Sequence, residues 1–159
     1  MYNNLQLLLD QPLTFKKEML DVANVVSDRI EFFSETHPEA QFKITLTPLQ
    51  AYVDPYALER VLDNIISNAI KYSQPHPMIT ITVTDSSITI EDNGIGIENC
   101  SKIFERHYRE IQGMQCAGGL GLGLSIVKKL CDQMGIDISL TSEHQQGSRF
   151  VLTFNNRSL

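Results

Sequence analysis

The sequence predicts an α+β fold, a two-layer α/β sandwich in which a mixed, mostly antiparallel sheet of about five strands packs on three helices. Two observations lead to this prediction. Apolar residues recur at helical spacing in three segments and alternate with polar residues in about five others, and these segments follow one another in mixed order. The length of 159 residues fits one domain with a single core.

The chain is expected to form one domain over residues 14–155. Residues 1–13 are rich in Asn, Gln and Leu and are interpreted as a leader or as the remnant of a preceding helix. Residues 97–120 show little periodic apolar pattern, and seven of the nine glycines fall between Gly94 and Gly123. A connection this long inside a compact domain is usually a functional lid. Residues 156–159 are a C-terminal tail.

The first elements are a short strand around Thr14–Met19 and a helix capped by Asp21. The helix is predicted by apolar residues at helical spacing, namely Val22, Val25, Val26, Ile30 and Phe33. The dipeptide His37-Pro38 ends it.

Two extended segments follow this helix. Gln41–Thr47 alternates apolar and polar residues, which predicts a half-buried strand. Ala51–Val53 is a second, shorter extended segment.

The clearest element is a helix over residues 55–73. Asp54 stands at its N-cap and Pro55 at its first position, where a missing N–H costs nothing. Pro75 and Pro77 lie beyond its end. Its apolar residues form one continuous stripe, made of Leu58, Val61, Leu62, Ile65, Ile66, Ala69 and Ile70.

The rest of the domain supplies four strands and one helix. Met78–Thr84 and Ser87–Glu91 are adjacent strands joined by a polar turn, and we expect them to be antiparallel. A helix runs from about Gly121 to Met134. Ile136–Leu140 and Arg149–Phe154 are two strands around the turn Gln145-Gln146-Gly147.

Composition excludes several classes of function. The formal net charge of −6 indicates a surface that repels phosphate polymers, so we expect no nucleic-acid partner. No apolar run approaches the roughly 20 residues that span a bilayer, and the N-terminus lacks the pattern of a signal peptide. Three cysteines without CxxC spacing indicate reduced thiols. We therefore expect a cytoplasmic domain without direct membrane contact and without a His/Cys metal site.

Four motifs are candidates for chemistry, and the first lies on the helix 55–73. Asn64 and Asn68 are four residues apart and therefore share one face, and Lys71 lies three residues further along it. Amide oxygens suit Mg²⁺, and a lysine suits a phosphate. On its own this pattern equally fits a solvated polar face.

The second motif is Glu91-Asp92-Asn93-Gly94-Ile95-Gly96-Ile97 at the end of a strand. Alternate glycines let the backbone turn sharply and let a flat ring approach closely. Asp92 can accept hydrogen bonds from a ligand's amino group. The alternative is a simple hairpin turn, because Asn-Gly is a strong turn dipeptide.

The third motif is the glycine-rich run Gly118–Leu124, which leads into a helix. Its glycines expose backbone N–H groups, and the positive end of the helix dipole adds to them, which favours phosphate. It is neither a Rossmann fingerprint nor a P-loop, since no strand leads directly into it and no Gly-Lys-Ser/Thr follows. A flexible hinge is the alternative.

The fourth motif, Ile103–Arg109, lies inside the expected lid. Apolar residues beside two arginines suit a segment that docks on the domain and closes over anionic phosphate. Surface decoration is the alternative for this motif taken alone.

Together and in this order, the four motifs resemble the catalytic and ATP-binding domain of bacterial sensor histidine kinases, a member of the GHKL superfamily with the Bergerat fold. ERVLDNIISNAIKYS resembles the N box, EDNGIGIE the G1 box, IFERHYR the F box and GGLGLGLSIVKKL the G2 box. The segment Gly147–Phe150 is similar to the last glycine motif. The resemblance covers residues 14–155.

The resemblance implies a site for ATP and Mg²⁺. It implies that Asp92 holds the adenine amino group and that Asn68 is the Mg²⁺ ligand. Asn64, Asn68, Lys71 and Arg109 are implied to act in catalysis. The implied nucleotide-binding residues are Asn64, Asn68, Lys71, Tyr72, Asp92, Gly94, Gly96, Ile97, Tyr108, Arg109, Gly119, Leu120, Gly121, Leu122, Gly123 and Leu124.

The resemblance also implies two partners, a histidine-bearing dimerisation domain of the same kinase and a cognate response regulator. The accepting histidine of the family stands in a motif like His-Glu-x-x-x-Pro, and no histidine of this chain has that context. We therefore expect the chain to bind nucleotide but not to phosphorylate itself. One departure is His107, where the family's F box usually has a second phenylalanine.

Other functions remain as alternatives. The ATP-hydrolysing relatives and the anti-sigma serine kinases carry a glutamate base where this chain has Asn64, and an amide cannot take a proton from water. Glu59 lies about one turn back, and Asp63 points roughly 100° around the helix, so neither replaces that base. A nucleotide-binding regulatory module without activity is the non-enzymatic alternative.

Overall fold

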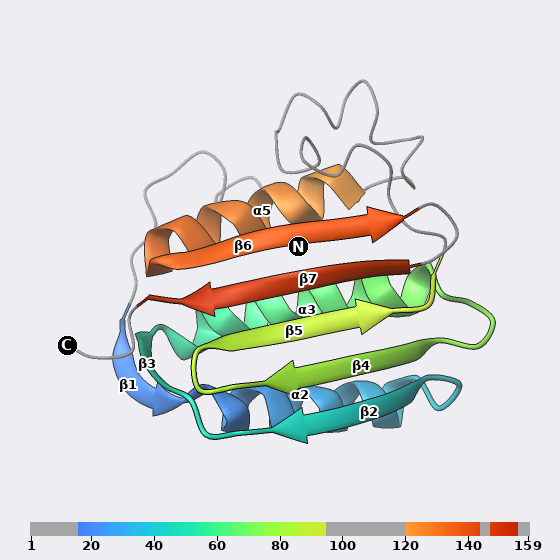
Figure 1. Ribbon diagram of the computed structural model, residues 1–159, viewed down its shortest axis with the longest axis horizontal. Helices are drawn as coiled ribbons and strands as arrows, with labels where there is room; N and C mark the ends of the chain where they lie inside the picture. Colours follow the sequence, from blue (N-terminus) through green and yellow to red (C-terminus); the bar gives the residue numbers. More distant parts are fainter. Residues whose placement is uncertain (1–15, 95–119, 144–146, 156–159) are drawn as a thin grey trace.

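The computed structural model describes residues 16–94, 120–143 and 147–155. Its main feature is a five-stranded sheet with the strand order β2-β4-β5-β7-β6, and helices lie on one face of it (Figure 1). The β2–β4 pair is parallel and the other three pairs are antiparallel. The strands are β2 (Gln41–Leu46), β4 (Met78–Val83), β5 (Ser87–Asp92), β7 (Gly147–Phe154) and β6 (Ile136–Glu143). The predicted two-layer α+β sandwich is confirmed.

The N-terminal elements form a small unit beside this sheet. Strand β1 (Glu18–Asp21) pairs antiparallel with β3 (Gln50–Val53), and helix α2 (Val22–Thr36) follows β1 directly. Asp21 caps α2 as predicted, because its Oδ1 accepts hydrogen bonds from the N–H of Ala23 and of Leu49, both at 3.0 Å. The strand lies later in the chain than the predicted Thr14–Met19.

Helix α3 (Pro55–Lys71) begins where the sequence predicts and ends two residues earlier. The Asp54 carboxylate accepts hydrogen bonds from the N–H groups of Tyr56 and Ala57, which caps the helix. Tyr72 is the C-cap. Tyr72 and Ser73 therefore lie at and beyond the end of the helix, which matters for the site described below. The predicted apolar stripe is buried along its whole length.

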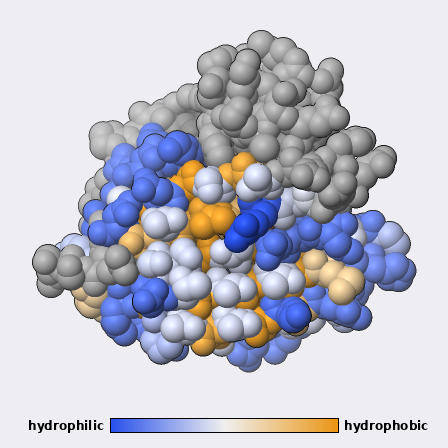
Figure 2. Space-filling model, viewed as in Figure 1, coloured by the Kyte–Doolittle hydropathy of each residue, from blue (hydrophilic) through white to orange (hydrophobic). Residues whose placement is uncertain are grey.

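The core lies between the helices and one face of the sheet. Because strand side chains alternate between faces, every second residue of β4, β5 and β7 points to the helices. These buried residues are Ile79, Ile81, Val83, Ile88, Ile90, Phe150, Leu152 and Phe154. The opposite face, turned to the viewer in Figure 2, carries many side chains of intermediate hydropathy, among them Thr80, Thr82 and Thr153.

Strand β2 differs from its prediction as a half-buried strand. Ile44 is 42% exposed and Leu46 is 38% exposed, although both alternate correctly with polar neighbours. The reason is that β2 is an edge strand, which has β4 as its neighbour on one side only. Apolar alternation predicted the strand but not its place in the sheet.

The C-terminal elements extend further than predicted. Helix α5 (Leu120–Met134) begins one residue before the predicted Gly121, β6 runs to Glu143, and β7 begins at Gly147 instead of Arg149. Gly147 is therefore part of a strand and not of the turn. No helix in the described ranges is long and apolar enough to cross a membrane.

Candidate functional site

The candidate site lies where three elements meet, at the end of α3, the end of β5 and the start of β7. The three elements approach one another most closely at Gly94, which lies two residues after the end of β5 at Asp92. A Cβ atom on Gly94 would lie 2.5 Å from the carbonyl oxygen of Tyr72 and 3.0 Å from both Asp92 Oδ1 and Ser73 Oγ. Three of the predicted site residues, Tyr72, Asp92 and Gly94, are thus brought together, and only glycine fits between them.

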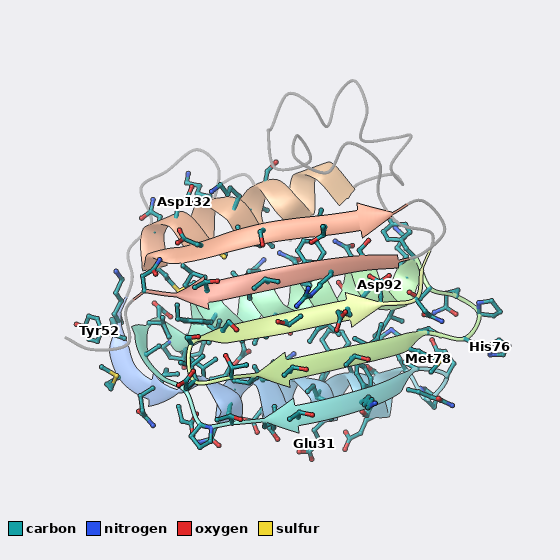
Figure 3. The ribbon with its side chains drawn as sticks, viewed as in Figure 1. Glu31, Tyr52, His76, Met78, Asp92 and Asp132 are labelled. Atoms are coloured by element: carbon teal, nitrogen blue, oxygen red, sulfur yellow. The ribbon has the colours of Figure 1, made fainter. Side chains whose placement is uncertain are left out.

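Asp92 is fixed in this corner by two backbone N–H groups. Its Oδ1 accepts hydrogen bonds from Gly94 at 2.8 Å and from Ser148 at 3.2 Å. Figure 3 shows Asp92 at the end of β5, beside the start of β7. Burial raises the pKa of the Asp92 carboxyl, and the two hydrogen bonds partly oppose that rise. Within the described part of the chain both hydrogen bonds fall on Oδ1, which leaves Oδ2 for a ligand.

Gly147, the first residue of β7, packs against the backbone of Asp92 on the other side of the site. Its φ is +95°, and a Cβ there would lie 2.0 Å from the carbonyl oxygen of Asp92. The sequence singled out Gly147 without giving it a task. The structure shows that a side chain at 147 would push β7 away from Asp92 and with it the N–H of Ser148.

Asn93 connects the site to the segment that follows α3. Its Oδ1 accepts a hydrogen bond from the N–H of Met78 at 3.0 Å, and its Nδ2 donates to the carbonyl of His76 at 3.3 Å. The alternative of a hairpin turn at Asn93-Gly94 is wrong, because the two neighbours of β5 are β4 and β7. The dipeptide instead ends the strand and braces a loop.

The polar residues of α3 are not a uniformly solvated face. Asn64 and Asn68 are half-buried and Lys71 is exposed. The Nδ2 atom of Asn64 is buried without a hydrogen-bond partner among the described residues. The Lys71 ammonium lies 5.2 Å from the centre of the Tyr72 ring. A buried amide with an unused donor suits a ligand better than it suits a solvated surface.

The remaining predicted residues belong to other parts of the chain. Five of them lie outside the described residues, namely Gly96, Ile97, Tyr108, Arg109 and Gly119. Leu120, Gly121, Leu122, Gly123 and Leu124 begin helix α5 and do not continue a loop. The first N–H groups of a helix have no acceptor within it, so this change keeps the donors that the prediction relied on. The start of α5 and the ends of α3 and β5 lie at the same end of the molecule (Figure 1).

Two acidic residues of α3 are turned away from the site. The guanidinium of Arg29 on α2 contacts both carboxylate oxygens of Asp63, at 2.8 Å and 3.1 Å, and lies 3.6 Å from Glu59. These carboxylates therefore serve the packing of α2 on α3. Neither is free to act as a base beside Asn64.

Sequence reasoning missed two residues of the site. Ser73 was taken as part of the helix, and Ser148 was named only within the segment Gly147–Phe150, without a role in the site. The sequence signal for Ser148 was its place directly after Gly147. Where a glycine is required by a close contact with another segment, the N–H of the next residue also lies near that segment. No sequence signal distinguishes Ser73 from a serine at any other helix end.

Comparisons with known proteins show the family to which the chain belongs. The family model described as histidine kinase-, DNA gyrase B- and HSP90-like ATPase matches residues 53–158. The sensor histidine kinase WalK of Bacillus subtilis (strain 168) is 34% identical over 151 residues, which cover 87% of this chain and 25% of WalK. The chain thus spans about a quarter of that relative's length.

Two solved structures show the same fold. The mycobacterial sensor histidine kinase MprB superposes with a TM-score of 0.73 at 24% identity, covering 91% of this chain and 100% of that one. Full-length ShkA gives a TM-score of 0.72 at 20% identity and covers 98% of this chain and 34% of that one. The chain belongs to the histidine kinase-, DNA gyrase B- and HSP90-like ATPase family, and within it to the ATP-binding catalytic domains of the sensor histidine kinase type.

Proposed function

We propose that this domain binds ATP and transfers its γ-phosphoryl group to a histidine on the dimerisation domain of a two-component sensor histidine kinase. The single observation that carries the proposal is the Asp92 corner, where a half-buried carboxylate is held by two N–H groups beside a glycine that admits no side chain. A carboxylate oxygen accepts a hydrogen bond from the amino group of adenine. ShkA, which shares the fold, is described in complex with AMPPNP.

The triphosphate would lie along α3 towards the start of α5. The residues of this chain fit a magnesium–phosphate group, because Asn64 keeps a buried donor that has no partner in the described part of the chain, and Lys71 is an exposed cation on the same helix. Asn68 would supply the amide oxygen to Mg²⁺, which when bound neutralises charge on the phosphates. The first N–H groups of α5 would add donors to the phosphates.

Transfer to another protein is favoured over hydrolysis. A hydrolytic ATPase needs a base for the attacking water, and Asn64 cannot take a proton. The neighbouring carboxylates of Asp63 and Glu59 are engaged by Arg29. Phosphoryl transfer needs positioning and neutralisation of charge more than it needs covalent help, and the residues described above can provide both.

The proposed partners follow from this chemistry. One is the dimerisation domain that carries the accepting histidine, and the other is a response regulator that receives the phosphoryl group from it. Because ATP is a cytoplasmic substrate, we propose that the domain works in the cytoplasm.

The experiment that tests the proposal is transfer in trans. The domain is mixed with γ-labelled ATP, Mg²⁺ and a separately made dimerisation domain of the same kinase, and the product is tested for acid-labile, base-stable phosphohistidine. We expect label on the dimerisation domain and none on this chain. Asn68→Ala should abolish the label, whereas Asn24→Ala, at an exposed position of α2, should not.

Two results would contradict parts of this proposal. Steady release of inorganic phosphate without phosphohistidine would favour a hydrolysing ATPase. Full labelling by Asn68→Ala would remove the magnesium role of that residue and leave the rest of the site standing.

A further inference from the structure

We infer that Ser73 helps to recognise the base of the nucleotide, with its hydroxyl hydrogen-bonded to a ring nitrogen next to the 6-amino group of adenine, directly or through one water. The inference rests on the proposed function, since it concerns the same nucleotide site. It adds a specificity-determining residue that is the last residue of the N-box segment but is not among the nucleotide-binding residues implied by the resemblance.

The first observation is that the Ser73 hydroxyl is buried and has no partner. The residue is 6% exposed, and its Oγ makes no hydrogen bond to any described residue. Its backbone is fixed, because its N–H donates to the carbonyl of Ile70 at the end of α3. The other buried serines, Ser125 and Ser148, each have a partner. Buried polar groups nearly always do, so an unused hydroxyl indicates a bond made to something else.

The second observation is where this hydroxyl lies. Ser73 Oγ and Asp92 Oδ1 are each 3.0 Å from the point that a Cβ on Gly94 would occupy, so they are at most about 6 Å apart. One water, or the edge of a ring bound to Asp92, spans such a distance. A Cβ on Gly94 would also lie 2.5 Å from the carbonyl oxygen of Tyr72, so only a glycine lets the two oxygens lie this close together.

The chemistry of the pair matches one edge of adenine. The Asp92 carboxylate can only accept, which suits the 6-amino group, and the Ser73 hydroxyl can donate, which suits the ring nitrogens N1 and N7 on either side of it. Guanine would place an oxygen against the Asp92 carboxylate instead. A serine kept only for its small size would work as well as alanine, which is the difference that an experiment can measure.

The test compares Ser73→Ala with the unaltered domain in calorimetric titrations of ATP, 1-deaza-ATP and 7-deaza-ATP. Ser73→Ala should keep or raise the melting temperature of the nucleotide-free domain, because it removes an unpaired buried hydroxyl. It should weaken ATP about tenfold, the loss of one hydrogen bond. One deaza analogue should show the same loss in the unaltered domain and no further loss in Ser73→Ala. The control is Ser27→Ala, at an exposed position of α2.

Several outcomes overturn the inference. Equal ATP affinity of Ser73→Ala and the unaltered domain would remove the role, and so would a deaza penalty of the same size in both proteins. A lower melting temperature together with weaker binding would indicate a structural serine, and the analogues measured on the unaltered domain would still decide the hydrogen bond. If the unaltered domain does not bind ATP at all, the proposed function fails first. If the unaltered domain binds ATP and Ser73→Ala binds it with the same affinity, the proposed function stands and only the inference about Ser73 fails.

Discussion

Asp92 is a partly buried carboxylate, and its burial disfavours the charged form. The end of β5 and the start of β7 bury it, while the N–H groups of Gly94 and Ser148 compensate in part through Oδ1. A folded protein tolerates such an arrangement where a ligand uses it. At the residue scale this opposition between stability and binding can be measured.

Replacing Asp92 by asparagine should separate the two effects. The raised pKa means that the folded state holds the proton more tightly than the unfolded state, whose value is 3.8. The stability that Asp92 contributes is therefore present in full below pH 3.8 and is lost as the pH rises through the higher folded pKa. The unfolding free energy of the parent minus that of Asp92→Asn should fall over this window and then level off. Urea titrations across the pH range measure it, and a difference that grows with pH would contradict the assignment.

Gly147 is the second residue with a sharp expectation. Gly147→Ala should lower the unfolding free energy by at least about 2 kcal/mol, since the new Cβ meets a carbonyl oxygen at a positive φ. Gly135→Ala is the matched control, because Gly135 also has a positive φ of 72° but lies at the opposite end of β6. That variant should cost about 1 kcal/mol and leave nucleotide affinity unchanged. Equal losses in both variants would argue against the close contact with Asp92.

Single residues show what the sequence could and could not predict. Asp92 and Gly94 were predicted because an acidic residue and alternate glycines at a strand end are a local pattern. Ser73 and Ser148 were not, because what matters in each is its distance to Asp92, and residues 92 and 148 are 56 positions apart. Such distances depend on which strands pair.

At the scale of elements, α3 positions the polar side of the site, and its start is held more firmly than a usual helix start. Asp54 is 7% exposed, and its carboxylate accepts hydrogen bonds from the N–H groups of Lys16, Tyr56 and Ala57. One acidic side chain therefore fixes both the helix and the segment that leads into β1.

Removing that cap should cost more than an exposed cap does. We expect Asp54→Ala to lower the unfolding free energy by about 2 kcal/mol, since it leaves buried N–H groups without an acceptor. Asp54→Asn retains an acceptor oxygen and should lose less than half as much. Chemical unfolding of the three proteins measures this, and equal stability of Asp54→Ala and the parent would show that water replaces the carboxylate.

Element boundaries were predicted where local chemistry sets them. The starts of α2 and α3 follow from Asp21 and Asp54 at their N-caps. The end of α3 was placed two residues late, since Tyr72 is the C-cap and Ser73 lies beyond it, where both approach Gly94. The exposure of Ile44 likewise follows from the edge position of β2.

At the scale of the whole molecule, the sheet order is what builds the site. Strand β7 lies between β5 and β6, so the start of β7 comes beside the end of β5. The sequence predicted both hairpin pairs, β4–β5 and β6–β7, but not that β7 pairs with β5. Predicting the fold class required only the kinds of secondary-structure element, whereas predicting the site required knowing which strands lie next to one another.

The most direct measurement of the central claim is a calorimetric titration of the domain with ATP and Mg²⁺, beside the same titration of Asp92→Asn. We predict a single binding event for the parent and its loss, or a weakening of more than about tenfold, in a variant that is folded and at least as stable at neutral pH. Absence of binding by the parent at millimolar nucleotide, or unchanged affinity in Asp92→Asn, would contradict the account.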